Sequence, residues 1–231
     1  MKRSKLYRAR LASYDRNNSY TLEEAVSILK EMPKPKFDET IDVAFKLGID
    51  TRQSDQNVRG AVTLPNGTGK TIKVVVVADG EAAEAAKEAG ADEVGSADLV
   101  EKIKGGWTDF DVLIATPAAM KDVRTLGRVL GPRGLMPNPK TGTVTDDTAS
   151  AVKESKAGRV EFRADKGGAA HMPLGKVSFD VSKLVENAET AIGAILKARP
   201  AAAKGNYMLS CTLSATMSPG VRIDLKDIVK V

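Results

Sequence analysis

The chain has 231 residues and 42% of them are hydrophobic, which is enough for one or two domains with buried cores. It carries 35 Lys and Arg residues against 30 Asp and Glu residues, and no stretch is apolar for long enough to predict a membrane span. The basic first residues lack the apolar segment of a secretion signal, and the lone Cys211 excludes an internal disulfide framework, so we expect a cytoplasmic globular protein.

Charge is distributed unevenly along the chain. Residues 1–66 hold 12 basic against 9 acidic side chains, residues 67–158 hold 12 against 14, and residues 159–231 hold 11 against 7. A domain formed by the two ends would therefore be strongly basic, which suits a polyanionic partner. An ordinary basic surface would explain the charge alone equally well.

The first third predicts one helix and two strands. Thr21 and Glu24 have the spacing of a capping box and begin a helix. From Phe37 to Ile49, apolar residues alternate with polar ones, as in a half-buried strand. A second short strand is expected at residues 61–64.

The glycine-rich stretch that follows ends in Gly69-Lys70-Thr71 and raises the possibility of a nucleotide phosphate loop. Such a loop needs a glycine where this chain has Leu64, and it leads into a helix. Here the β-branched run 72–77 predicts a strand instead. We therefore interpret the stretch as a flexible crossing between two structural units and not as the site of an NTP-hydrolysing enzyme.

The middle third alternates predicted strands and helices, which is typical of a small parallel sheet covered by helices. The expected elements are a strand at 72–78, a helix ending at Gly90, a strand near Val94, a helix at 98–104, a strand at 111–115 and a helix at 145–156. No GxGxxG motif follows the first strand, so no dinucleotide cofactor is predicted.

The last third returns to alternating patterns. We expect antiparallel strands at 159–163 and 171–179 joined by a turn at Lys166-Gly167-Gly168, then a long helix capped by Ser182. The final strand, 207–218, places apolar residues on one side and five hydroxyl residues on the other: Ser210, Thr212, Ser214, Thr216 and Ser218.

These patterns predict a two-domain protein of the α/β and α+β classes. Residues 1–66 plus 159–231 would form an antiparallel-sheet α+β domain, and residues 67–158 an inserted, parallel-sheet α/β domain of Rossmann-like type. Two tandem domains would produce the same local patterns. A hinged small-molecule binder is a further alternative, but no polar cluster at the domain crossing defines a ligand.

Residues suited to catalysis or metal binding are scarce. One histidine and one cysteine cannot supply the usual ligands of a zinc site, so neither a metal nor another cofactor is expected. His171 lies in a predicted strand with no nucleophile pattern beside it, which leaves structural packing or RNA contact. We predict no catalytic residues and no enzyme activity.

Two features suit contact with RNA, although each also has a structural explanation. The hydroxyl row is typical of a solvent-exposed sheet face, but short uncharged side chains also let an RNA backbone approach closely. The stretch 127–144 carries Arg128, Arg133 and Lys140 on an irregular loop, which can be either a connector or an anion contact.

Four longer motifs closely resemble the bacterial ribosomal protein L-one family, which belongs to the mobile lateral stalk of the large ribosomal subunit. They are Lys36–Thr40, Ser54–Gly60, Leu130–Pro139 and Ala157–Arg163. The resemblance covers nearly the whole chain in the correct order. It implies an RNA-binding domain built from both termini and an inserted second domain.

The resemblance also implies partners and a site. The partners would be stalk ribosomal RNA, exit-site tRNA released in deacylated form, other ribosomal components and the protein's own messenger, whose translation it would repress. The implied RNA-binding residues are Lys36, Phe37, Thr40, Arg163, Lys166, His171, Ser210, Thr216, Met217 and Ser218. Ser218 departs from the family pattern, which usually has glycine there, and serine adds a side chain where the RNA backbone would approach closely.

Overall fold

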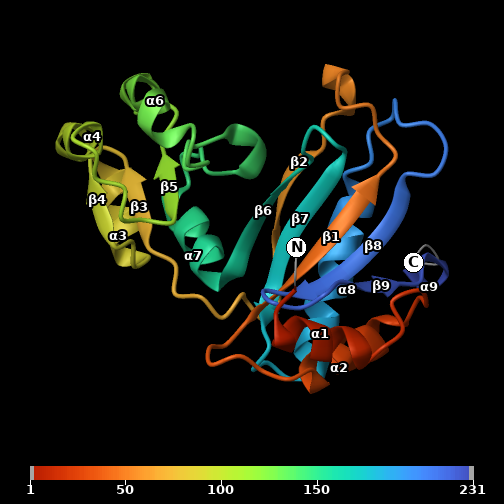
Figure 1. Cartoon of the computed structure of the whole chain (residues 1–231). Helices are drawn as coiled ribbons and strands as arrows, with labels where there is room; N and C mark the ends of the chain where they lie inside the picture. The colour runs from red at the N-terminus through yellow and green to blue at the C-terminus, as the bar shows by residue number, and fades with distance from the viewer. Residues whose placement is uncertain (1–2, 229–231) are drawn as a thin grey trace. The chain divides into compact units, whose positions relative to one another are not determined.

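The computed structural model describes residues 3–228, and these residues divide into two compact units (Figure 1). One unit contains the described residues up to Gly69 and those from Val160 onward. The other contains Lys70–Arg159. No helix among the described residues has the combination of length and apolar character that crossing a membrane requires.

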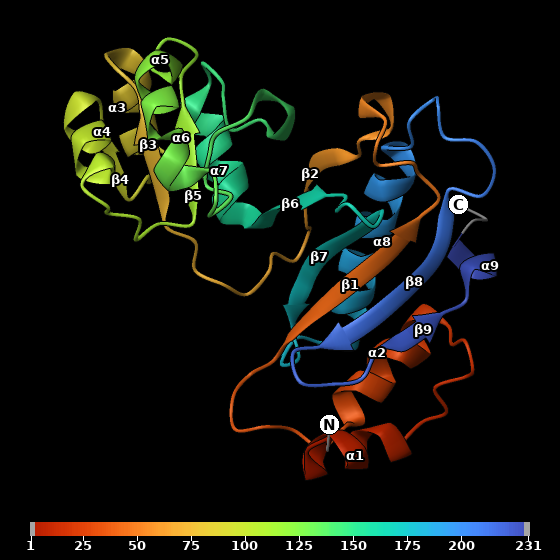
Figure 2. The same cartoon turned by 45° about the horizontal axis from the view of Figure 1, so that its top comes forward.

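The first unit is built on a four-stranded antiparallel sheet with strand order β7-β1-β8-β9 (Figure 2). Its strands are β1 (Thr40–Leu47), β7 (Ala169–Lys176), β8 (Met208–Ala215) and β9 (Val221–Ile223). Its helices are α1 (Lys5–Ala12), α2 (Leu22–Glu31), α8 (Val181–Lys197) and α9 (Leu225–Ile228), with a 3-10 turn at Ser54–Gln56.

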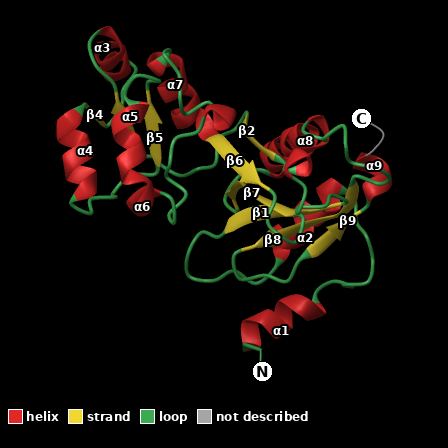
Figure 3. Ribbon diagram, turned by 90° about the horizontal axis from the view of Figure 1, so that it is seen from above, coloured by secondary structure: helices red, strands yellow, loops and turns green. Residues whose placement is uncertain are grey.

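Helices α2 and α8 cover one face of this sheet (Figure 3). Alternate residues of β1, including Ile41, Val43 and Phe45, are almost fully buried in the core between sheet and helices. Burial of this apolar face is the main stabilising contribution to the unit. The opposite face of the sheet is therefore left open.

The predicted start of α2 agrees with the structure, whereas the predicted start of α8 does not. The capping box of α2 is confirmed, because Thr21 Oγ1 accepts from the Glu24 N–H and Glu24 Oε2 accepts from the Thr21 N–H. The prediction for α8 is wrong by two residues, since its N-cap is Asp180 and Ser182 lies in the first turn. The Asp180 side chain makes no capping hydrogen bond, although aspartate is a preferred N-cap residue.

The predicted hairpin between residues 159–163 and 171–179 is wrong in its pairing. Strand β6 (Arg159–Arg163) pairs with β2 (Arg59–Thr63) in a separate two-stranded sheet, whereas β7 pairs with β1. The turn itself is tight, because the Asp165 carboxylate accepts the N–H groups of Ala169 and Gly167 at 2.8 Å each. These bonds hold the pKa of Asp165 below its usual value.

Three apolar residues predicted to face the core are instead exposed: Leu209, Phe37 and Met217. Leu209 is 50% exposed because the register of β1 and β8 shifts at Lys46/Leu47, where Met208 takes the buried position opposite Leu47. Phe37 is 51% exposed because it precedes β1 and lies in the loop after α2. Met217 is exposed because β8 ends at Ala215, so the predicted alternation extended past the ends of both strands.

The second unit contains the predicted parallel sheet, with strand order β4-β3-β5. Its strands are β3 (Val74–Val77), β4 (Glu93–Gly95) and β5 (Val112–Ala115). Its helices are α3 (Glu81–Glu88), α4 (Ala97–Lys104), α5 (Met120–Val123), α6 (Gly127–Leu130) and α7 (Thr148–Gly158), with 3-10 turns at Arg124–Leu126 and Pro139–Thr141.

Strand β3 explains why this sheet is covered on both faces. Val75 and Val77 pack into one apolar cluster, and Val74 and Val76 into another. All four valines are buried, as expected for a central parallel strand. The mixed α/β and α+β fold class predicted from the sequence is thereby confirmed.

Candidate nucleic-acid interface

The open face of the antiparallel sheet presents short polar side chains in aligned rows. Strand register places His171, Ala44, Thr212 and Arg222 side by side across β7, β1, β8 and β9. Cross-strand neighbours of this kind lie on the same face. The adjoining rows consist of Pro173, Asp42 and Ser214, and of Ala169, Lys46 and Ser210.

Cationic side chains surround the hydroxyl groups on this face. Lys46 and Arg222 are exposed, and Lys176 Nζ donates to Thr40 Oγ1 at 2.9 Å. Partial burial raises the pKa of Asp42, although His171 and Lys176 oppose that shift. The face is thus a shallow surface of hydroxyls and cations with one central carboxylate.

Thr216 joins the start of β1 to the turn after β8. Its Oγ1 accepts from the Thr40 N–H at 3.1 Å, and its N–H donates to the Thr40 carbonyl at 3.1 Å. The hydroxyl row is therefore not continuous: Ser210, Thr212 and Ser214 lie in β8, while Thr216 lies in the turn and holds Thr40.

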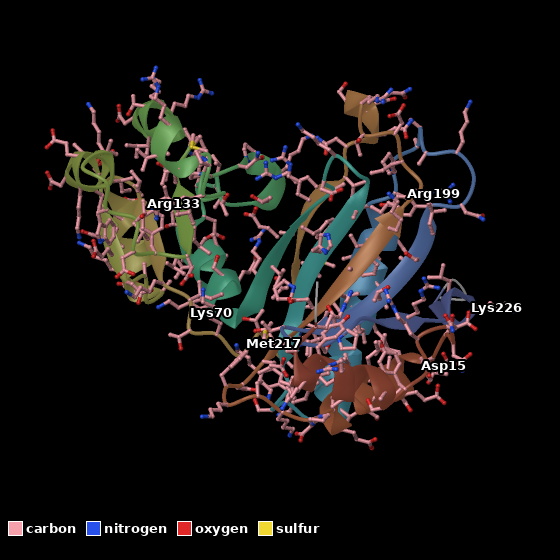
Figure 4. The ribbon with its side chains drawn as sticks, viewed as in Figure 1. Asp15, Lys70, Arg133, Arg199, Met217 and Lys226 are labelled. Atoms are coloured by element: carbon pink, nitrogen blue, oxygen red, sulfur yellow. The ribbon has the colours of Figure 1, made fainter. Side chains whose placement is uncertain are left out.

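A buried ion pair fixes the two loops that carry the exposed apolar residues. Arg10 and Glu39 are 1% and 4% exposed and form two hydrogen bonds, at 3.0 Å and 2.7 Å. Arg10 Nε also donates to the Pro33 carbonyl, and Glu39 Oε1 accepts the Met217 N–H at 2.8 Å. Glu39 thereby holds the loop of Phe37 and the turn of Met217 (labelled in Figure 4) together.

Phe37 and Met217 are each about half exposed, at 51% and 50%. Exposed apolar side chains on anchored loops can stack on or pack against the bases and sugars of a folded RNA. Lys36, which precedes Phe37, is also exposed. The predicted residues of these two loops therefore lie at one end of the open face.

The remaining predicted residues occupy other positions. His171 and Ser210 are exposed on the open face, and Lys166 lies in the turn between β6 and β7. Lys46 Nζ donates to the Gly167 carbonyl, which places that turn at the far end of β1. Arg163 is exposed but belongs to the separate β2-β6 sheet.

Ser218 is engaged within its own turn. Its Oγ accepts from the Ala215 N–H at 2.7 Å and lies 2.9 Å from the Pro219 carbonyl, to which it can donate. The serine side chain therefore closes the turn that presents Met217, in a position where glycine could not make these bonds.

The glycine-rich crossing does not form a phosphate loop. Lys70 Nζ pairs with the Asp111 carboxylate, and this hydrogen bond is the main reason that the pKa of Asp111 is lowered. The Asp111 carboxylate also accepts the Lys73 N–H at 3.1 Å. Lys70 thus anchors the chain entering β3.

Sequence reasoning missed Arg10, Asp42, Lys46 and Arg222. Arg10 lies in a basic segment whose local pattern does not indicate burial, and its partner Glu39 is 29 residues away. The other three could have been found from strand alternation, because each shares a face with a residue that was predicted.

Comparison with known proteins gives a consistent result. Residues 29–219 match the Ribosomal protein L1p/L10e family. The protein named large ribosomal subunit protein uL1 of Chlamydia caviae is 54% identical over 228 residues, which cover 99% of this chain and 98% of that protein. Proteins of the same name from Chlamydia pneumoniae and Chlamydia abortus are each 53% identical, with the same coverage. An identity above one half over almost the full length, together with the family match, means that this chain belongs to the ribosomal L1 family.

Proposed function

We propose that the protein is a structural component of the large ribosomal subunit in the cytoplasm and binds ribosomal RNA of the lateral stalk. Family membership and the names of its full-length relatives support this assignment, and those names denote subunit proteins and not enzymes. The structural observation that most supports the proposal is the open sheet face, which ends in two loops held by the buried Arg10–Glu39 pair.

The chemistry of this surface suits a folded RNA better than a flexible single strand. Aromatic residues make up only 4% of the chain, so a platform for stacking successive bases is absent from the composition. Hydroxyl groups on the face can bond to phosphate and 2′-OH groups, and the surrounding cations add attraction that depends on salt. Phe37 and Met217 would supply the apolar contacts.

The test is a binding titration of the purified protein against a stalk-type ribosomal RNA fragment and a scrambled hairpin of equal length. We expect tight binding to the fragment that persists when salt is added, and weak, salt-sensitive binding to the hairpin. Phe37→Ala should weaken binding to the fragment, because it removes an apolar contact with the RNA. The half-exposed ring lies outside the core, so the fold should not change. Equal affinity for the two RNAs would contradict the assignment.

We also propose that the protein assists release of deacylated tRNA from the exit site. The inserted unit supports this role with five exposed basic residues on one short segment: Lys121, Arg124, Arg128, Arg133 and Lys140. Arg128→Gln with Arg133→Gln should weaken tRNA binding while leaving the affinity for the stalk fragment unchanged. Loss of both affinities together would indicate misfolding or a single shared surface.

Repression of the protein's own messenger is the third part of the proposal. A messenger segment that folds like the stalk RNA would use the same open face, so the two RNAs should compete. A competition titration with the leader of its messenger tests this expectation. Simultaneous binding of both RNAs would show that different surfaces are used.

A further inference from the structure

A groove of about 610 Å³ lies at the β9 edge of the antiparallel sheet, beside the open face. Its polar lining includes Arg16, Ser19, Ser210, Thr212, Arg222 and Lys226. Of these six residues, only Ser210 belongs to the RNA-binding set implied by the family resemblance. The groove therefore extends the candidate interface to the loop between α1 and α2 and to β9 and the residues after it, to which the sequence assigned no role.

The loop between α1 and α2 forms one wall of this groove. The Tyr20 N–H donates to the Arg222 carbonyl at 3.0 Å, and the Asp224 N–H donates to the Tyr20 carbonyl at 2.9 Å. The Tyr14 hydroxyl donates to the Gly220 carbonyl at 2.9 Å. These bonds hold the loop along β9, so that Arg16 faces the groove from a fixed segment.

The loop is also braced internally. The rings of Tyr14 and Tyr20 meet edge to face with centroids 6.3 Å apart. The Tyr20 hydroxyl donates to the Asp15 carbonyl, and Asp15 Oδ1 accepts the Asn17 N–H at 2.9 Å. The Asp15 carboxylate is thus used within the loop (Asp15 and Lys226 are labelled in Figure 4).

Three exposed cations face this groove from different segments: Arg16, Arg222 and Lys226. Among the described side chains, no ion pair involves any of the three. The one acidic residue of the lining, Asp224, accepts the Lys226 N–H at 2.9 Å. The groove therefore carries an excess of positive charge, and its lining combines hydroxyl groups with apolar residues such as the half-exposed Leu209.

The groove is continuous with the open face. Thr212 of β8 is the direct partner of Arg222 of β9, and Ser210 belongs to both surfaces. A phosphodiester backbone alternates anionic phosphates with ribose hydroxyls, which matches the cations and hydroxyl groups among the lining residues. An acidic peptide would also match the charges, but the continuity of the groove with the candidate RNA interface favours RNA.

We propose that this groove binds the phosphate–sugar backbone of the same ribosomal RNA, at the β9 edge of the open face. The inference rests on the proposed function, because it extends the same interface. Arg16, Arg222 and Lys226 would contact phosphates, while Ser210 and Thr212 would bond to sugar or phosphate oxygens.

The experiment compares two double variants that remove the same charge. Arg222→Gln with Lys226→Gln removes two positive charges from the groove. Lys183→Gln with Lys197→Gln removes two positive charges from exposed residues of α8, on the covered side of the sheet. Affinity for the stalk-type RNA fragment is measured at several salt concentrations. Log affinity falls as log salt rises, and each lost phosphate contact should make that negative slope shallower by about 0.7 to 0.9.

We expect the groove variant to bind roughly tenfold more weakly, with a slope reduced by about 1.5, and the α8 variant to match the wild type. The charge-preserving variant Arg222→Lys with Lys226→Arg should retain most of the slope. Thermal unfolding of each variant checks that the fold is intact. Hydroxyl-radical footprinting should show backbone protection that only the groove variant loses.

The other possible outcomes distinguish a failure of the groove inference from a failure of the proposed function. If the wild type prefers the fragment to the scrambled hairpin but the groove variant keeps its affinity and slope, the groove inference is overturned and the proposed function stands. If both double variants lose the same slope, the effect is general attraction and the inference is again overturned. If the wild type shows no preference, the proposed function itself fails.

Discussion

The Arg10–Glu39 pair is the residue-scale feature on which the candidate interface depends most. We expect Arg10→Met to lower the free energy of unfolding by about 3 to 5 kcal/mol, because it leaves the Glu39 carboxylate buried without its cation. Adding Glu39→Gln should recover part of this loss, since the amide oxygen can still accept the Met217 N–H. Urea denaturation of the single and double variants measures both effects. A loss below about 1 kcal/mol would contradict this role of the pair.

Thr216 offers a second residue-scale prediction. Thr216→Val removes the acceptor of the Thr40 N–H and should weaken binding to the stalk fragment by roughly 1 to 3 kcal/mol. Thr190→Val is the matched control, because Thr190 is a partly exposed threonine whose hydroxyl also bonds to a backbone carbonyl, that of Glu186. A folded Thr216→Val protein with normal affinity would remove Thr216 from the site.

We expect the Cys211 thiol to be unreactive in the folded protein. It is 1% exposed, and burial raises the pKa of its thiol to about 12, so the reactive thiolate is scarce at neutral pH. We expect slow modification by a thiol reagent under native conditions and rapid modification in urea. Fast labelling of the native protein at pH 7 would mean that β8 opens readily.

At the scale of single elements, the capping box of α2 is the clearest case in which a local motif forms a local structure. Thr21→Ala should cost about 1 kcal/mol of stability, because the Glu24 N–H loses its partner. Glu24→Gln should cost less, since the amide can keep the reciprocal bond. Denaturant midpoints compare the two variants, and an equal cost would argue against the box.

Strand β8 shows how an element can differ from its sequence pattern. Alternation predicts a core position for Leu209, but the register shift opposite Lys46/Leu47 moves the buried position to Met208. Such a shift depends on the partner strand β1, which lies more than 160 residues earlier in the chain.

At the scale of the whole molecule, the inserted unit and the RNA-binding face should act separately. Lys70→Ala breaks an ion pair within the inserted unit that is largely exposed, so we expect little loss of stability. Affinity for the stalk fragment should stay within about twofold of the wild type. Saturable nucleotide binding that depends on Lys70 would instead revive the phosphate-loop interpretation.

Local sequence patterns are sufficient to predict the fold class, the main helices and strands, and the family. They are sufficient because apolar periodicity and capping motifs act over a few residues, and because four long motifs occur in the order of that family. The hydroxyl row was visible for the same reason.

The contacts between distant segments become apparent only in the folded chain. There β6 pairs with β2, Thr216 bonds to Thr40, and Arg10 is buried beside Glu39. The groove at β9 also needs three segments that are separated in the chain. Strand pairing and buried ion pairs depend on contacts between residues far apart in sequence, which local patterns do not encode.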